Sequence, residues 1–296
     1  MIKQNYIKIE ETLYPIPVLP FGVEIECYCP VDAGWGGMIL SRDDNIGDDV
    51  IPIHVEKSTG WMCTEDLSLG CLEGADSWEY ISPVMTGRYG AMGLVNMCNR
   101  LNKIGALTDE ETGMHVHIDT RHRECINAEI REIALWESFL QMQEVMFGIV
   151  DLDRHDNEEC EKIQFGKNPY KRKNHYCGEF PHFAKKEYWG NAVCSAHIKD
   201  RGDFQFRLFH GSTDAVEILH QSCISSRMVY FSLEQLNEKI DPDNQPTKYD
   251  DIIEIVQGID FMQSVENMLD DKILYDYYQE KSRQLDYRSR ETQNNR

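Results

Sequence analysis

The chain has 296 residues, of which 41% are hydrophobic and 27% are charged, and its formal net charge is -21. This composition is typical of a globular protein with one large domain or two small ones, and disorder is not the default. The negative charge argues against nucleic acid or an anionic membrane surface as a partner. No apolar stretch approaches the roughly 18 residues of a membrane span, and the first residues lack an apolar signal core. We therefore expect a cytoplasmic protein.

Ten cysteines are scattered along the chain without the regular spacing of a small disulfide-rich scaffold. We expect most of them to be reduced thiols in or near the core. Cysteine and histidine are frequent between His155 and His197, but their spacing does not match a closed zinc site. A loop region with buried thiols is the favoured interpretation.

The first clear element is a strand over residues 21–27. Because side chains two residues apart on a strand share a face, Glu24 and Glu26 lie together, opposite a row of apolar residues. Such a face can simply be exposed to water, as in many antiparallel sheets. Two neighbouring carboxylates repel each other, however, unless a cation lies between them. The pattern therefore suggests a metal site.

A glycine-rich turn or lid is expected over residues 32–47. Strands follow over residues 51–56 and 78–81, the second ending before Pro83, which cannot donate a hydrogen bond to a sheet. Apolar residues at helical spacing then predict a helix over residues 89–104.

The next strand covers residues 114–119 and places His115 and His117 on one face. A helix capped by Asn127 follows it. The strand over residues 204–208 repeats the arrangement with Gln205 and Arg207 on its polar face. After that strand, a helix begins at Asp214, where Glu217 can complete a capping box.

A proline-rich turn over residues 241–246 separates these elements from further helices. We therefore predict a catalytic domain over residues 15–240 and a helical C-terminal extension over residues 241–296, with a polar, frayed tail from Ser282. The irregular order of strands and helices predicts an α+β fold with a mostly antiparallel sheet and helices packed on its apolar face.

The three polar faces together suggest chemistry with phosphate. Glutamate and histidine ligands suit Mg²⁺ or Mn²⁺, and the planar guanidinium of Arg207 can hold a phosphoryl or carboxylate group. Metal ions and an arginine are recurring parts of phosphoryl-transfer sites. The sequence has no Walker loop, no G-x-S-x-G elbow and no H-E-x-x-H helix, which disfavours covalent hydrolase chemistry.

These segments, taken in order over about residues 20–230, resemble the putative amidoligase family of carboxylate-amine ligases, which is similar to glutamine synthetase and glutamate-cysteine ligase. The resemblance rests on the following residues: Gly22-Val23-Glu24-Ile25-Glu26, Asp66-Leu67-Ser68, Glu79 in a Trp-Glu-Tyr-Ile-Ser-Pro run, Gly113-Met114-His115-Val116-His117, Asn191, and Phe206-Arg207-Leu208-Phe209.

The resemblance implies an antiparallel sheet that forms a funnel and binds ATP with Mg²⁺ or Mn²⁺ on its polar face. It implies metal ligation by Glu24, Glu26, Glu79 and His115, and places His117 nearer the nucleotide. Asn191 and Arg207 would hold a substrate carboxylate or phosphate. The implied reaction joins a small-molecule or peptide carboxylate to an amine through an acyl phosphate, and Asp66 or Asp119 can help to deprotonate the amine.

One residue departs from the family pattern, because Gln205 stands where a glutamate is expected. Its carbonyl oxygen can still bind a hard cation but brings no negative charge, so we expect weaker metal binding. Asp203 on the same strand face can compensate. A catalytically weakened nucleotide- or metal-binding relative that acts through partners is therefore the alternative. We expect the loops at residues 32–47 and 160–187 to determine the acceptor, and the C-terminal helices can support an oligomer.

Overall fold

The computed structural model describes residues 4–31, 40–42, 54–56, 58–66, 68–70, 72–151, 154, 192–194 and 198–294. The chain forms two compact units, and each is described by itself. The strand unit comprises Gln4–Val116 and Phe209–Cys223, and the helical unit comprises His117–Leu208 and Ile224–Arg296 together with Met1–Lys3. Strands β8 (Gly113–Asp119) and β10 (Asp203–His210) and helix α5 (Ala215–Lys239) contribute residues to both units.

The strand unit contains a small hairpin and most of the main sheet. The hairpin, which the sequence patterns did not reveal, pairs β1 (Asn5–Ile9) with β2 (Thr12–Ile16). In hydrogen-bonded order, the main sheet contains β4 (Leu40–Arg42), β5 (His54–Glu56), β6 (Met62–Glu65), β7 (Ala75–Ile81), β3 (Phe21–Pro30) and the first residues of β8. The pairs from β4 to β3 are antiparallel. The expected mostly antiparallel α+β fold is confirmed, whereas the funnel remains a prediction.

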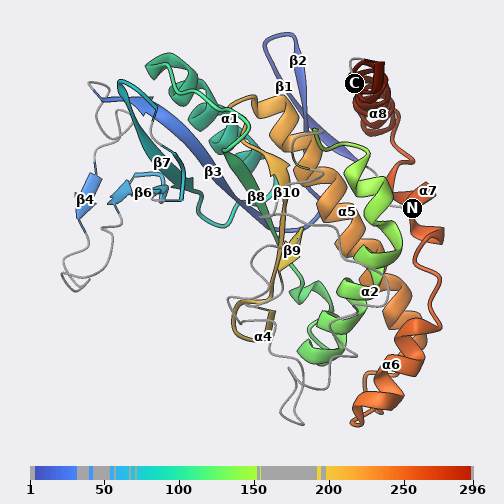
Figure 1. The fold of residues 1–296 in the computed structure, drawn as a ribbon. Helices are drawn as coiled ribbons and strands as arrows, with labels where there is room; N and C mark the ends of the chain where they lie inside the picture. Colours follow the sequence, from blue (N-terminus) through green and yellow to red (C-terminus); the bar gives the residue numbers. More distant parts are fainter. Residues whose placement is uncertain are drawn as a thin grey trace. The chain divides into compact units, whose positions relative to one another are not determined.

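Strand β3 shows the predicted alternation of its two faces. Val23, Ile25 and Cys27 are at most 1% exposed, whereas Glu24 and Glu26 are only partly buried. Helix α1 (Gly87–Ile104) covers the apolar face, since its Cys98 lies close enough to Cys27 to affect the thiol electrostatically (Figure 1). Each such buried side chain contributes roughly 1.5–3 kcal/mol. The sheet therefore presents its carboxylates on the face opposite α1.

Helix α1 ends where the sequence allows the chain to reverse. Gly105 follows the helix with a φ of 79°, in the left-handed region, and its N–H bonds to the carbonyl groups of Asn102 and Leu101. Glycine adopts this conformation without the clash that a Cβ atom causes. The predicted helix at this position is confirmed.

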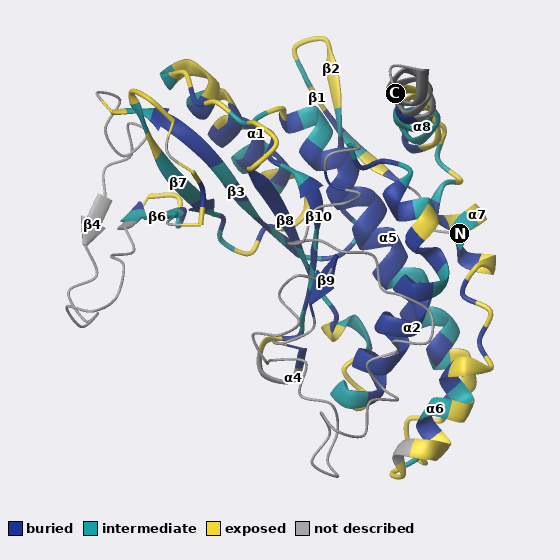
Figure 2. Ribbon diagram, viewed as in Figure 1, coloured by how far each residue is buried: buried dark blue, intermediate teal, exposed yellow. Residues whose placement is uncertain are grey.

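The helical unit is built around α2 (Ala128–Phe147) and the C-terminal part of α5. The side chain of Asn127 accepts a hydrogen bond from Glu129 N, which confirms the predicted cap. Helix α2 is buried on most of its surface, more than the apolar spacing in the sequence predicted (Figure 2). The unit also contains the following short elements: η3 (Arg121–Arg123), β9 (Val193–Cys194), which pairs antiparallel with β10, and α4 (Ile198–Arg201).

The start of α5 corrects the predicted capping box. Asp214 accepts a hydrogen bond from Val216 N, as an N-cap residue should. In a capping box, Glu217 would accept a hydrogen bond from the N–H of Asp214. Instead, that N–H donates to Ser212 Oγ, and the Ser212 hydroxyl donates to Glu217 Oε2. A serine two residues before the cap therefore relays the bond.

Three helices complete the C-terminal region: α6 (Tyr249–Gln257), α7 (Gln263–Met268) and α8 (Lys272–Asn294). Helix α8 continues well past Ser282, where the sequence predicted a frayed tail. Its polar residues there include glutamine, arginine and glutamate, which are good helix formers.

In the described part of the chain, no helix combines the length and apolar character needed to cross a bilayer. The domain boundary at residue 240 stays a prediction.

Most described cysteines are buried free thiols, as expected. Six are buried, and Cys125 is exposed. The buried ones are Cys27, Cys29, Cys63, Cys98, Cys194 and Cys223. Burial raises the pKa of Cys98 and of Cys63 to about 12, which keeps both thiols protonated and unreactive.

Candidate active site

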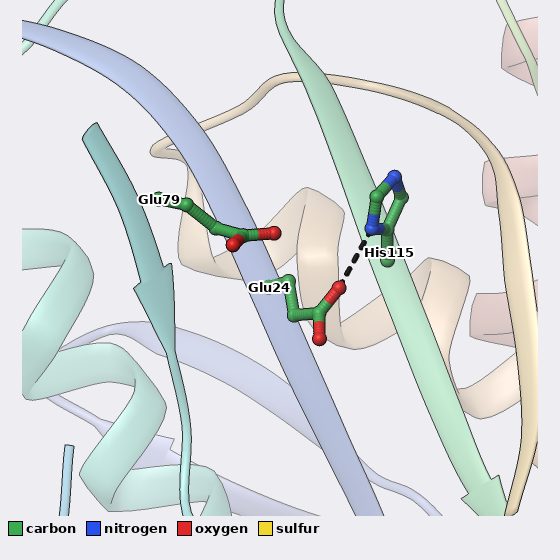
Figure 3. Close-up of side chains that lie close together, drawn as sticks. All are labelled: Glu24, Glu79 and His115. Carbon is green, nitrogen blue, oxygen red and sulfur yellow. Dashed lines mark hydrogen bonds and ion pairs between the residues drawn. The ribbon is translucent and has the colours of Figure 1, made fainter. Parts of the chain in front are cut away.

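Three side chains from neighbouring strands of the strand unit converge on the polar face of the sheet. Glu24 of β3, Glu79 of β7 and His115 of β8 each offer a ligand atom, and these atoms all lie within 4.8 Å of one another. Figure 3 shows the Glu79 carboxylate directed toward the Glu24–His115 pair. His115 Nδ1 lies 2.7 Å from Glu24 Oε2. We call these three residues the carboxylate–histidine cluster.

Glu26 lies beside this cluster and is held by the backbone. Glu26 is directly opposite Glu79 in the antiparallel β3–β7 pair. Its Oε2 accepts a hydrogen bond of 2.5 Å from Gly113 N, and its Oε1 lies 3.6 Å from His115 Nε2. The imidazole therefore lies between the two carboxylates that the alternating pattern placed on one face of β3.

The cluster has the donor set of a divalent cation site. His115 is 6% exposed at its side chain, and Glu24 and Glu26 are 21% and 14% exposed. Carboxylates this close together and shielded from water repel each other, and a cation between them removes that cost. Oxygen ligands with one imidazole fit Mg²⁺ or Mn²⁺. The residues present thus fit the metal that the sequence implied.

In the helical unit, the predicted nucleotide-binding residue His117 has an acidic partner. Its Nδ1 lies 2.8 Å from Asp203 Oδ2, and both side chains are about 20% exposed. A carboxylate bound to one ring nitrogen sets the orientation and tautomer of the imidazole. Asp203, the residue that can compensate for glutamine at position 205, is therefore already bonded to His117.

Strand β10 carries Gln205 and Arg207 on the same face as Asp203, and the alternating Phe204, Phe206 and Leu208 are fully buried. Both polar backbone groups of Arg207 are hydrogen-bonded: its N–H donates to Ala192 O, and its carbonyl accepts from Arg154 Nη2. Nε of Arg207 is buried and has no hydrogen-bond partner among the described residues. A guanidinium N–H in this state is suited to an anionic ligand.

The two candidate proton acceptors, Asp66 and Asp119, each have a partner two residues further along the chain. Asp66 Oδ1 accepts hydrogen bonds from the N–H and the hydroxyl of Ser68, an arrangement typical of an Asx turn. Asp119 forms a two-pronged ion pair with Arg121. The catalytic role of Asp66 stays a prediction. Asn191 and most of the two loops expected to recognise the acceptor lie outside the described residues.

The sequence patterns missed three contacts that hold the histidines and carboxylates in place. They are the Gly113 N–H bond to Glu26, the pairing of His115 with Glu24, and the pairing of His117 with Asp203. A signal for the third existed, because Asp203, Gln205 and Arg207 have the same alternating spacing as the other polar faces. The pairing itself joins residues far apart in the sequence, so no local pattern could show it.

Comparison with known proteins adds the family. A family model described as "Putative amidoligase enzyme" matches residues 17–227, which is most of the chain. The chain belongs to this amidoligase family. The match contains every segment on which the resemblance rests, and it supports a carboxylate-amine ligase in general terms. A search of curated proteins found no match.

Among solved structures, the chain is similar to one titled as a bifunctional glutathione synthetase from Pasteurella multocida. The two share 11% sequence identity with a TM-score of 0.42, and the alignment covers 90% of this chain. It covers 48% of the synthetase chain, so this amidoligase spans about half the length of that protein.

Proposed function

We propose that this amidoligase is an ATP-dependent carboxylate-amine ligase that proceeds through an acyl phosphate. One observation carries the proposal: a chain of the amidoligase family brings two carboxylates and a histidine within 4.8 Å of one another on the polar face of its sheet. This donor set can hold the divalent metal ion that takes part in ATP-dependent phosphoryl transfer. The substrates are a carboxylate and an amine, either small molecules or peptide groups.

Glu24, Glu79 and His115 would hold Mg²⁺ or Mn²⁺, with Glu26 as a further ligand and Gln205 as a neutral one. When bound, such an ion neutralises charge that develops on the phosphate oxygens during transfer. The short hydrogen bond from Gly113 N to Glu26 keeps that carboxylate in place before any ligand binds. A preorganised site of this kind loses less free energy to reorganisation.

In the proposed reaction, a substrate carboxylate oxygen attacks the γ-phosphorus of ATP, the bond to ADP breaks, and an acyl phosphate forms. A neutral amine then attacks the acyl carbon, phosphate leaves, and the amine proton passes to a base such as Asp66. Arg207 would stabilise the transferring anion through its Nε, which has no hydrogen-bond partner in the described part of the chain. His117, oriented by Asp203, and Asn191 would contact the nucleotide or the substrate.

The test is release of ADP with Mn²⁺ or Mg²⁺ and paired carboxylate and amine substrates. We expect ADP release only when both substrates are present, and a loss of about 100-fold or more in a Glu24→Ala, Glu26→Ala double variant. The control variant Glu73→Ala, Glu110→Ala removes two exposed carboxylates and should retain activity. Full activity in the first double variant would contradict the proposal.

A second candidate function is a catalytically weakened relative that binds nucleotide and metal and acts through partners. The observation that favours it is Gln205, which removes one negative charge from the proposed ligand set. Calorimetry of ATP and Mn²⁺ binding together with the ADP-release assay distinguishes the two functions. The second predicts that ATP and Mn²⁺ bind while no ADP is released with any carboxylate-amine pair.

A further inference from the structure

A cavity lies in the strand unit, and no residue of the carboxylate–histidine cluster lines it. Its volume is about 600 Å³, which is in the range of small-molecule sites. The turn between β5 and β6, the segment after β7, and helix α1 form its walls. Helix α1 covers the apolar face of the sheet, so the cavity belongs to the face opposite the carboxylates.

One stripe of α1 faces this cavity. Tyr89, Gly93, Asn96 and Arg100 are spaced three or four residues apart, so they lie on one side of the helix, and all four line the cavity. A Cβ atom added at Gly93 would meet no atom within 4 Å. The missing side chain at position 93 thus leaves open space in the wall.

The polar end of the cavity is an ion pair. Glu56, with a side chain only 6% exposed, accepts hydrogen bonds of 3.0 and 3.1 Å from Nη1 of Arg100 and one of 2.5 Å from Thr59 Oγ1. The carboxylate is therefore well satisfied and fixes the arginine in place. Among the described residues, no hydrogen bond is made by Nε or Nη2 of Arg100, whose side chain is 35% exposed.

Large apolar side chains form another part of the cavity wall. Trp61 and Met85 are 3% and 4% exposed, and both contribute to its wall. Val84 and Tyr89 line it as well, although they are 72% and 88% exposed. Large apolar side chains with this exposure become buried when a ligand covers them, which favours binding.

We propose that this cavity binds a small carboxylate that carries an apolar or aromatic body. The Nε–Nη2 edge of Arg100 is the edge that holds a carboxylate through two parallel hydrogen bonds, while Nη1 stays with Glu56. The apolar body of the ligand lies against Trp61, Met85 and Tyr89. A neutral or cationic ligand of the same shape lacks the charge-assisted bonds to Arg100. The site is separate from the proposed ligase reaction.

Calorimetry on the full-length protein tests the proposal with three probes of one shape: 3-phenylpropionate, its neutral amide, and 3-phenylpropylamine. We expect the carboxylate to bind about tenfold or more tightly than the amide, and the amine to bind least. Equal affinity for carboxylate and amide, or no binding of the carboxylate at millimolar concentration, would overturn the proposal.

Two variants test the cavity itself. Gly93→Leu fills the open space without disturbing the ion pair, and we expect it to abolish binding of the carboxylate. Asn99→Leu is the matched control, because it places the same side chain on an exposed position of the same helix outside the cavity, and it should bind as wild type does. Thermal unfolding checks that both variants fold. Wild-type affinity in Gly93→Leu would overturn the proposal.

Arg100→Lys gives an independent readout. Lysine keeps the charge beside Glu56 but lacks the planar edge, so the preference for carboxylate over amide should fall by about tenfold. An unchanged preference would overturn the role of Arg100. The ADP-release assay is unaffected by these outcomes, since the cavity and the carboxylate–histidine cluster share no residue.

Discussion

At the scale of single residues, His115 joins the two carboxylates of β3. Its Nδ1 is bound to Glu24 at 2.7 Å and its Nε2 lies 3.6 Å from Glu26. An imidazole in this position offsets the repulsion between two neighbouring carboxylates, either with its own proton or as a ligand beside them to a shared cation. Glu24 and His115 thus belong both to this contact and to the carboxylate–histidine cluster, with Glu26 beside them.

Gln205 is the residue whose substitution tells most about the proposed function. Gln205→Glu adds a carboxylate where the family pattern has one, so we expect tighter Mn²⁺ binding, by about tenfold, and faster ADP release if weak metal binding limits the reaction. Titration calorimetry and the ADP assay measure both. Glu238→Gln, which changes charge at an exposed position on α5, is the control. Unchanged Mn²⁺ affinity in Gln205→Glu would exclude position 205 from the metal site.

At the scale of secondary-structure elements, charged side chains connect η3 to α5 in the helical unit. Arg123 donates to both carboxylate oxygens of Glu234, at 2.8 and 2.7 Å, and His122 Nε2 lies 3.2 Å from the same carboxylate. His122 also stacks on Tyr230, with ring centroids 4.9 Å apart. Burial opposes ionisation of Glu234, but the bonds from Arg123 and His122 lower its pKa overall.

A lowered pKa makes this connection depend on pH in a definite direction. The folded protein binds the Glu234 proton less tightly than the unfolded chain does, so the stabilisation is present above the unfolded pKa of about 4.3 and is lost as pH falls below it. We expect Glu234→Gln to lower the free energy of unfolding by about 1 kcal/mol at pH 7. Urea unfolding between pH 7 and about pH 3 should show this difference shrinking at the acidic end, below the unfolded pKa.

The matched control is again Glu238→Gln, one turn further along α5 on an exposed position. It should change stability little at either pH. If Glu234→Gln and Glu238→Gln behave alike at pH 7, the ion pair with Arg123 does not stabilise the unit.

At the scale of the whole molecule, the C-terminal helices form part of the helical unit. Gln141 of α2 binds the backbone of Ile259 and of Phe261, and fully buried Arg227 of α5 binds Asp270 and the carbonyl of Asn267. The region that the sequence suggested as an extension therefore makes polar contacts with the core helices. The catalytic domain over residues 15–240, separate from the C-terminal helices, stays a prediction.

Removing Asp270 tests how strongly this region is held. Asp270→Ala leaves the buried guanidinium of Arg227 without its carboxylate, and we expect a loss of about 3 kcal/mol in the free energy of unfolding. The double variant Arg227→Met, Asp270→Ala removes both charges and should recover much of that loss. Asp276→Asn, at the exposed ion pair with Lys272, is the control and should cost about 0.5 kcal/mol or less. Urea unfolding measures all three.

Much of the local structure could be predicted from the sequence, because alternation and capping depend on neighbouring residues. The two faces of β3, β8 and β10, the Asn127 cap and the start of α5 at Asp214 all agree with the structure. The short strands β4, β6 and β9 and the hairpin of β1 and β2 were missed, since a few residues of ordinary composition carry too weak a pattern.

In the candidate site, too, pairs within one strand could be predicted from the sequence, whereas contacts between strands could not. The spacing in the sequence is enough to place Glu24 with Glu26, His115 with His117, and Gln205 with Arg207, because each pair lies on a single strand. The contact of His115 with Glu24 joins positions 91 residues apart, and that of His117 with Asp203 joins positions 86 apart. Such contacts depend on which strands pair and in what register, and these follow from packing of the whole sheet. Only the tertiary structure could therefore bring β3, β7 and β8 together as a metal-binding face.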